Sequence, residues 1–229
     1  MANSRVFYGV YVLEYSAEER SSVSPNRWEF LLQSLRDLDK SLSQFGSRLY
    51  VVKGRPVETF PHLFKQWDIT RLSFEADCEP YCKIRDNVVS GLAREAGIEV
   101  ISCVSHTLYD PEALFRSTGG KTPLLIDEFK ELVLQHGRPE MPVKRVDRKL
   151  FGSCVTPVGR DHSQLYGVPT LEELGFHKTH ATCSELYPGG EDEALVRLEA
   201  ALHEVKGSSS LSLTRVALGL SKICLLYMR

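Results

Sequence analysis

The chain has 229 residues, and its 28 Lys and Arg against 30 Asp and Glu give a formal net charge of −2. This near-neutral balance gives no whole-protein electrostatic case for binding nucleic acid or an anionic membrane. Hydrophobic residues make up 42% of the sequence, which is ordinary for a soluble protein with a core. No apolar run reaches the length of a transmembrane helix.

The six cysteines do not form a CxxC pair. The closest spacing is that of Cys78 and Cys82, and a zinc site there would need Cys103 or His106 as further ligands. That spacing fits no zinc pattern well. We therefore expect reduced thiols, no metal site, and a place in the nucleus or the cytoplasm.

The first half of the chain predicts alternating strands and helices. Arg5–Tyr15 is nearly continuous in apolar residues, as expected of a strand buried on both faces. Pro25 starts a helix with apolar residues at spacings of three and four, and Gly46 ends it. Strand-like runs and helical patterns then alternate, in the order Arg48–Lys53, Val57–Trp67, Arg71–Ala76, Pro80–Ala96 and Glu99–Val104. This order predicts an α/β fold, a Rossmann-like parallel sheet with flanking helices.

Two of the predicted helices carry apolar residues that we expect to face the core. In the helix Pro80–Ala96 these are Tyr81, Ile84, Val88 and Leu92. A further helix is predicted over Pro123–Gln135, and its inward residues are expected to be Leu125, Phe129, Leu132 and Val133.

The second half of the chain has a different character. Gly137–Thr170 is rich in Pro and Gly and weakly periodic, which predicts a linker over the surface. At its end, Thr170 and Glu173 have the spacing of a helix capping box. Residues 191–205 predict an amphipathic helix, and residues 206–229 form a Ser- and Leu-rich tail without acidic residues.

The sequence offers no pattern for catalysis or for nucleotide binding. Neither GxGxxG nor GxxxxGK[ST] is present, which removes the dinucleotide fingerprint and the P-loop. Glu75 and Asp77 follow a strand but point to opposite faces, so they do not form an acid/base pair. His106 has no nucleophile arranged with it by sequence. We therefore predict no catalytic, cofactor-binding or metal-ligating residues.

Six motifs in the same order resemble those of animal cryptochromes and (6-4) photolyases. They lie at Asn26–Leu35, Ser47–Gly54, Glu79–Asp86, Ser105–Pro111, Gly167–Phe176 and Pro188–Leu195. The resemblance runs from about Arg5 to about Val205. It implies that residues 1–135 form the family's α/β antenna-type domain, residues 136–190 its interdomain linker, and residues 191–205 a linker helix. Residues 206–229 do not resemble the family.

The resemblance also implies a function for full-length relatives. They are FAD-dependent blue-light photoreceptors, circadian clock repressors or light-driven DNA repair enzymes, and an all-helical domain holds the flavin and, in the photolyases, the DNA lesion. We expect that domain to be absent, so that this chain lacks catalysis. The alternatives are a flavin-free binding module and a non-functional transcript product.

The beginning of the sequence departs from the family pattern as well. Met1–Ser4 leads directly into what resembles the family's second strand, so we expect the first strand to be absent. Two strands would then face a gap with unpaired backbone groups, each costing about 1–3 kcal/mol when buried. We therefore expect marginal stability unless the strands pair again differently.

Tyr81, Cys82 and Arg85 are the candidate binding residues. Tyr81 and Arg85 lie four residues apart on one helix face, just after a strand's carboxyl end. In the family this motif lines an antenna-pigment pocket of some photolyases and a partner-protein groove of clock cryptochromes. Cys82 stands where the family usually has Gly or Ala, and Ile84 where it is usually polar. The alternative is that Tyr81 belongs to the core and Arg85 to a solvated face.

Overall fold

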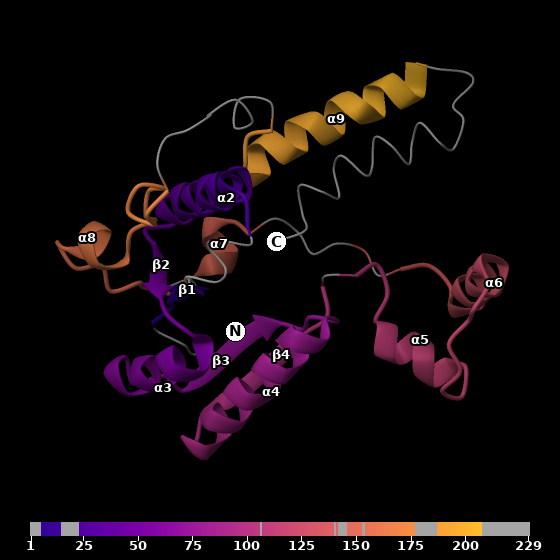
Figure 1. Cartoon of the computed structure of the whole chain (residues 1–229), viewed down its shortest axis with the longest axis horizontal. Coiled ribbons are helices and arrows are strands. Elements are labelled where there is room, and N and C mark those ends of the chain that lie inside the picture. The colour runs from indigo at the N-terminus through magenta and orange to yellow at the C-terminus, as the bar shows by residue number, and fades with distance from the viewer. Residues whose placement is uncertain are drawn as a thin grey trace. The chain divides into compact units, whose positions relative to one another are not determined.

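A computed structural model describes residues 6–14, 23–105, 107–139, 141, 146–152, 154–176 and 187–207 (Figure 1). The chain divides into two compact units. Unit 1 holds the described parts of residues 1–53 and 146–229, and unit 2 those of residues 54–145. Each unit is an α/β arrangement of its own.

Unit 1 contains a parallel pair of strands joined by a long helix. Strand β1 (Gly9–Leu13) pairs with β2 (Leu49–Lys53) from one end to the other, and α2 (Pro25–Ser43) connects them. This is the strand–helix–strand order expected of a parallel sheet. The core of the unit gathers one face of α2 against the strands; its buried members are Leu13, Trp28, Leu32, Leu35, Leu49, Val51 and Leu174.

The ends of α2 follow from its sequence. Ser24 has the extended conformation of an N-cap, and Pro25 occupies the first helical position, where its missing N–H costs no hydrogen bond. Gly46, three residues beyond Ser43, has a φ of +75°, which glycine adopts without a steric penalty. The predicted helix is confirmed in its type and nearly in its bounds.

The segment predicted as a surface linker contributes to the core of unit 1, so that prediction is wrong for part of its length. It contains two short helices, α7 (Arg148–Phe151) and α8 (His162–Tyr166). Thr156 and His162, within the predicted linker, are buried, and so is Leu174 just after it. The Nε2 atom of His162 lies 3.0 Å from the carbonyl oxygen of Leu49.

Local hydrogen bonds fix this segment further. The Thr156 hydroxyl donates to the carbonyl of Phe7 over 2.8 Å, and the Ser47 hydroxyl, 2.5 Å away, donates to Thr156. The predicted capping box is confirmed, because the Thr170 N–H donates to Glu173 (2.8 Å) and the Glu173 N–H to the Thr170 hydroxyl (3.2 Å).

Helix α9 (Glu191–Gly207) starts against α2. The carboxylate of Asp37 accepts a hydrogen bond from the Glu191 N–H over 2.8 Å, so one helix caps the N-terminus of the other. Just before it, the Gly189 N–H donates to the side chain of Gln33 over 2.7 Å. The rest of α9 extends beyond α2, as the ribbon shows (Figure 1).

Unit 2 contains the second pair of strands. Strand β3 (Arg71–Glu75) pairs in parallel with β4 (Glu99–Cys103), and α4 (Pro80–Glu95) connects them. Helix α3 (Pro56–Gln66) packs beside α4. Phe64, Ala93 and Ile98 form the buried cluster between these elements. All the helices and strands predicted between residues 48 and 104 are therefore present.

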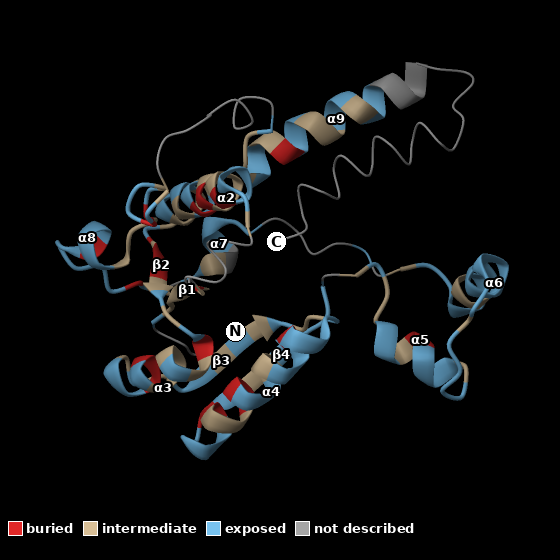
Figure 2. Cartoon of the chain, in the orientation of Figure 1, coloured by how far each residue is buried: buried red, intermediate tan, exposed pale blue. Residues whose placement is uncertain are grey.

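The sheet is more exposed than its sequence predicts. The described strands form two separate two-stranded sheets. Along β1 only Leu13 is fully buried, and β3 alternates between exposed and half-buried residues (Figure 2). The expected burial of the first strand on both faces is therefore wrong.

Two helices complete unit 2. They are α5 (Pro111–Ser117) and α6 (Ile126–His136). The helix predicted over Pro123–Gln135 is present as α6, which ends one residue later than predicted. None of its residues is buried. The side chains of Leu125 and Phe129, predicted to face inward, are 64% and 43% exposed. Its neighbour α5 is too short to cover this apolar face.

Candidate functional site

Helix α4 carries all three residues predicted to bind. It starts directly after the carboxyl end of β3, the edge at which parallel sheets collect ligands. The N–H of Glu79, the N-cap residue, donates to the carboxylate of Asp77 over 3.0 Å, and Pro80 occupies the first helical position. This turn fixes the direction in which the first helical residues point.

One face of α4 belongs to the core. Cys82, Val89 and Ala93 are 2%, 4% and 0% exposed, and their spacing of seven and four places them on one side of the helix. Ser90 is buried beside them. Cys82 therefore packs inside unit 2, whereas Tyr81 is exposed, and the role of Cys82 in a pocket stays a prediction.

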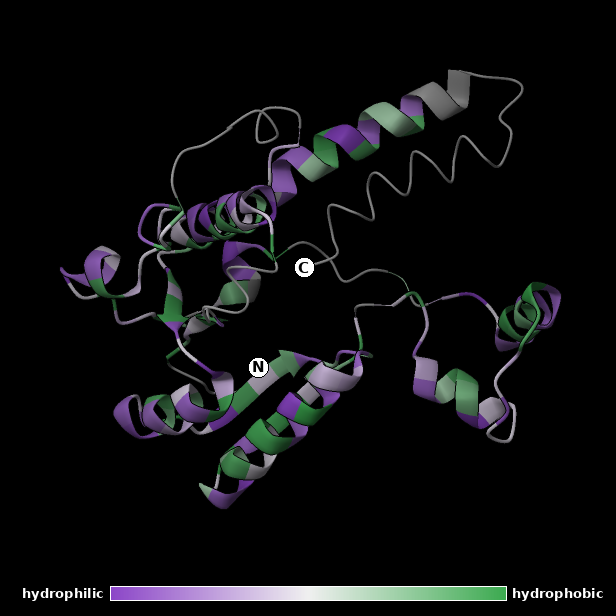
Figure 3. Cartoon of the chain, in the orientation of Figure 1, coloured by the Kyte–Doolittle hydropathy of each residue, from purple (hydrophilic) through white to green (hydrophobic). Residues whose placement is uncertain are grey.

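The opposite face of α4 carries an exposed apolar stripe. Tyr81, Ile84 and Val88 are 57%, 66% and 43% exposed. Their spacing of three and four lines them up along the helix, and the hydropathy view shows apolar bands along α4 (Figure 3). The prediction that these residues face the core is wrong. The helical spacing of the apolar residues identifies the stripe, but the stripe faces solvent and not the core.

Arg85 lies at the edge of this stripe, four residues after Tyr81. Its Nε and Nη2 atoms lie 2.8 and 2.7 Å from one carboxylate oxygen of Asp86. The two side chains are 29% and 16% exposed, so the pair is partly shielded from water. Tyr81 and Arg85 both lie on α4, four positions apart, and the carboxylate of Asp86 holds the Arg85 guanidinium in place.

Charged residues flank the stripe. The Nζ atom of Lys83 lies 3.2 Å from the carboxylate of Glu112 on α5, and both side chains are exposed. Such an exposed pair contributes little to stability, but it gives the apolar stripe a polar border. The Ser16–Ser24 loop, named as a further rim of the site, lies mostly outside the described residues.

The acidic, cysteine and histidine residues considered for catalysis or metal binding do not form a site among the residues that the structure describes. Glu75 accepts a hydrogen bond from the Ser105 hydroxyl over 2.5 Å. Cys78, Cys82 and Cys103 are not joined in disulfides, and His106 lies outside the described residues. In the described part of the chain, His, Cys, Asp and Glu do not gather in threes that could hold a metal ion. None of its helices is long and apolar enough to cross a membrane.

A shallow cavity in unit 1 is a separate feature. It has a volume of about 230 Å³ and is lined by Phe45, Gly46, Arg148, Phe151 and Gly152. Sites for drug-sized ligands have volumes of about 300–1,000 Å³. The cavity is too small to enclose a dinucleotide such as FAD, so its residues do not fit that cofactor.

Among the described residues, the side chains with shifted pKa values belong to unit 1. Burial raises the pKa of Tyr50 and of Tyr8, and the neighbouring Tyr166 adds to both shifts. Burial opposes ionisation of Asp39 as well, but hydrogen bonds from Arg48 and from the Leu49 N–H, with the charge of Arg48, leave its pKa below the ordinary value. These groups anchor the packing of the unit.

The elements described so far define a class, an α/β protein with parallel strand pairs, crossover helices and an exposed helix face beyond a strand end. Comparison with known proteins identifies the family within this class. The family model described as DNA photolyase matches residues 1–146, which is more than half of the chain. The chain therefore belongs to the DNA photolyase family, as its motifs predict.

Similar proteins include several animal cryptochromes. Cryptochrome-1 of Mus musculus is 48% identical over 193 residues, covering 84% of this chain and 32% of that protein. Cryptochrome-2 of Gallus gallus is 44% identical over 193 residues, with 84% and 33% covered. The chain thus spans about a third of the length of these relatives.

Solved structures agree on the fold. The Synechocystis sp. PCC6803 cryptochrome matches with a TM-score of 0.68 at 20% identity, covering 88% of this chain and 41% of that one. A Sulfolobus tokodaii photolyase with two FAD molecules matches with a TM-score of 0.62 at 20% identity, covering 85% and 40%. The fold is that of the N-terminal α/β region of photolyases and cryptochromes.

Proposed function

We propose that this chain acts as a cryptochrome-type binding domain that engages a clock protein through α4. The observation that carries the proposal is the exposed stripe of Tyr81, Ile84 and Val88 on the helix of the Glu79–Asp86 motif. Apolar residues with a polar border, including an aromatic residue and an arginine, are typical of protein interfaces. The relatives at 44–48% identity are cryptochromes, which favours a clock role over DNA repair.

The same geometry favours a protein over an antenna pigment. Small-molecule sites are concave and bury most of the surface of their ligand. Tyr81 and Ile84 are instead 57% and 66% exposed on the outer face of a helix, and Cys82 turns inward. A partner protein can cover such a face, whereas a pigment would need walls around it.

Catalysis is not part of this proposal. Light-driven repair by full-length relatives depends on FAD, and the cavity described in unit 1 does not fit that cofactor. The visible spectrum of the purified chain with added FAD provides a check. A stoichiometric flavin band would contradict a flavin-free binding role and would require a site elsewhere in the protein.

Binding assays with two α4 variants and one control test the proposal. Clock proteins are first screened by pull-down with the wild-type chain, and binding is then measured by calorimetry. Tyr81→Ala and Ile84→Ala should weaken the complex about tenfold or more, since truncating interface anchors costs about 1–4 kcal/mol. Leu134→Ala, at an 80% exposed position on α6, should leave binding unchanged.

Arg85→Ala requires a stability control. It removes the ion pair with Asp86, whose side chain is 16% exposed, so local unfolding would weaken binding as well.

Equal losses of affinity for Leu134→Ala and Tyr81→Ala would contradict the proposal. So would the absence of binding by any clock protein to a chain that melts cooperatively.

A further inference from the structure

Helix α9 carries a second exposed apolar stripe, in unit 1. Leu195 and Leu202 are 46% and 49% exposed, and Leu198 between them is half-buried. The spacing of three and four puts the three leucines on one face. Ala194, one residue before this stripe, is buried at 8% exposure. The stripe therefore begins where α9 leaves its supporting helix.

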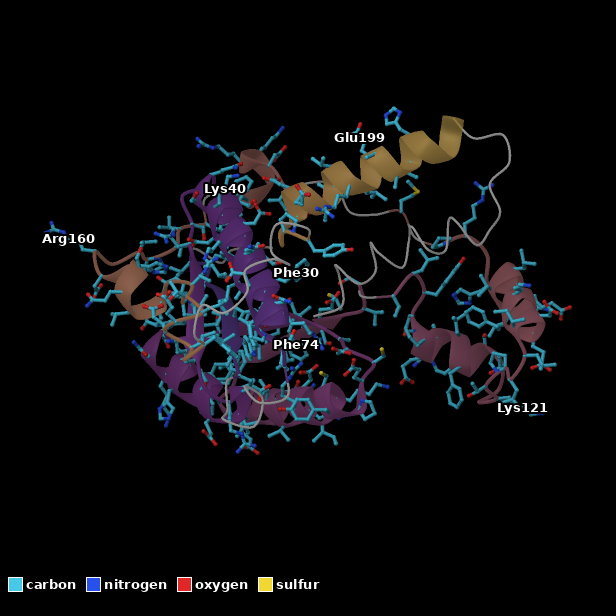
Figure 4. The ribbon with its side chains drawn as sticks, turned by 45° about the horizontal axis from the view of Figure 1, so that its top comes forward. Phe30, Lys40, Phe74, Lys121, Arg160 and Glu199 are labelled. Carbon is cyan, nitrogen blue, oxygen red and sulfur yellow. The ribbon has the colours of Figure 1, made fainter. Side chains whose placement is uncertain are left out.

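The contacts of α9 are concentrated at its first turns. Asp37 of α2 accepts hydrogen bonds from the Glu191 and Asp192 N–H groups over 2.8 and 3.2 Å, and Lys40 lies 3.5 Å from the Asp192 carboxylate. Among the described elements, α2 supplies the substantial contacts to α9. Figure 4 shows α9 extending past Lys40, with Glu199 on its surface. The leucine stripe thus needs another segment to cover it.

The charge of α9 limits what that segment can be. Glu191–Gly207 contains five acidic and two basic residues, a net charge of −3. A second copy of α9 would bring like charges together, which disfavours pairing. A basic segment with an apolar stripe is the better complement.

Residues 208–229 have this composition. They contain Arg215, Lys222 and Arg229 and no acidic residue, a net charge of +3. Val216, Leu220 and Ile223 are spaced by four and three, the reverse of the leucine spacing on α9. A reversed order is what an antiparallel partner needs, because it pairs Leu202 with Val216, Leu198 with Leu220 and Leu195 with Ile223.

The connection has a suitable length. Helix–helix connections in bundles are about 2–8 residues long, and Ser208, Ser209 and Ser210 follow the last residue of α9. We propose that the segment 213–227 of this chain docks antiparallel on the leucine stripe of α9. This interaction closes the exposed face within one molecule, and it is independent of partner binding at α4.

Hydrogen–deuterium exchange on the full chain, read by mass spectrometry, tests this docking. Peptides covering residues 213–227 should exchange about tenfold or more slowly than an unstructured peptide of the same sequence. Leu195→Asp and Leu202→Asp should return them to the unstructured rate. Val196→Asp is the matched control, because Val196 is more exposed (64%) and lies about 100–160° around the helix from each leucine.

Three outcomes would overturn the proposal. The first is exchange of residues 213–227 at the unstructured rate in the wild type, which would mean that the stripe is covered by another protein or not at all. The second is protection that survives both leucine substitutions. The third is protection that disappears on dilution together with a dimer seen by sedimentation, which would identify a second copy as the occupant.

Discussion

The contact between Asp39 and the start of β2 offers a sharp test of what holds unit 1 together. One carboxylate oxygen of Asp39 accepts the Leu49 N–H over 2.8 Å and the Arg48 Nε over 2.9 Å, and the other accepts the Arg48 Nη2 over 2.8 Å. The Asp39 and Arg48 side chains are 20% and 30% exposed. Through this pair, helix α2 fixes the first residue of the strand.

Asp39→Asn removes the charge and one acceptor while keeping the shape. A hydrogen bond to a charged group contributes about 1.5–3 kcal/mol, and partial exposure reduces the ionic part. An asparagine oxygen in place of Oδ1 can still accept from the Leu49 N–H and the Arg48 Nε, but its amide group then turns an N–H toward Arg48 Nη2 and the charge is lost. We therefore expect the free energy of unfolding to fall by about 1.5–3 kcal/mol at neutral pH.

The effect should depend on pH in one direction. The pKa of Asp39 is lowered in the folded protein, so its contribution to stability is present above the unfolded pKa of about 3.9. It disappears as the pH falls through the lower folded value. The difference between wild type and Asp39→Asn should shrink below about pH 4.

Urea unfolding followed by circular dichroism, at neutral pH and in steps below about pH 4, measures both effects. Asp127→Asn is the control, because the Asp127 side chain is 83% exposed and its ion pair is with an exposed lysine. Its change should stay within about 0.5 kcal/mol. Equal stability of wild type and Asp39→Asn at neutral pH, or a deficit that persists in acid, would refute the reasoning.

Two predictions concern the attachment of α9 to α2. Asp37→Ala leaves the Glu191 N–H without its acceptor, so we expect a loss of about 1 kcal/mol and faster amide exchange in the first turn of α9. In Gly189→Ala, the added Cβ would lie 2.2 Å from the Phe30 carbonyl oxygen. This crowding should lower the unfolding free energy by about 1–3 kcal/mol. Gly91→Ala on α4, where a Cβ meets nothing within 4 Å, should be neutral or stabilising, and similar losses at both glycines would contradict the steric argument.

Much of the fold can be predicted from the sequence, because helix-end residues and the alternation of strand and helix patterns agree with the structure. Pro25 and Gly46 mark the ends of a long amphipathic helix, and the alternation of residues 48–104 specifies the connections between parallel strands. The buried members of the linker are harder to predict. Thr156 and His162 are single buried residues without periodic neighbours, and their partners, Ser47 and Leu49, lie more than a hundred residues away.

Helix α4 shows why the candidate site could be located but not oriented. Its sequence carries two apolar faces, one of Tyr81, Ile84 and Val88 and one of Cys82, Val89 and Ala93. Both faces have the periodicity of a buried helix face, and the larger side chains of the first face predict that it is the buried one. Packing reverses this choice, because small residues let a helix approach the sheet and the helix beside it closely.

Substitutions at two neighbouring positions of α4 should therefore act in different ways. Cys82 is 2% exposed and belongs to the core, so a change there should affect stability. Ile84 is 66% exposed and extends the apolar stripe beside Tyr81. Partner binding should therefore depend more on position 84 than on position 82. Ile84→Glu would place a charge on the stripe without changing a core residue, so it should weaken binding while the unfolding free energy stays nearly unchanged.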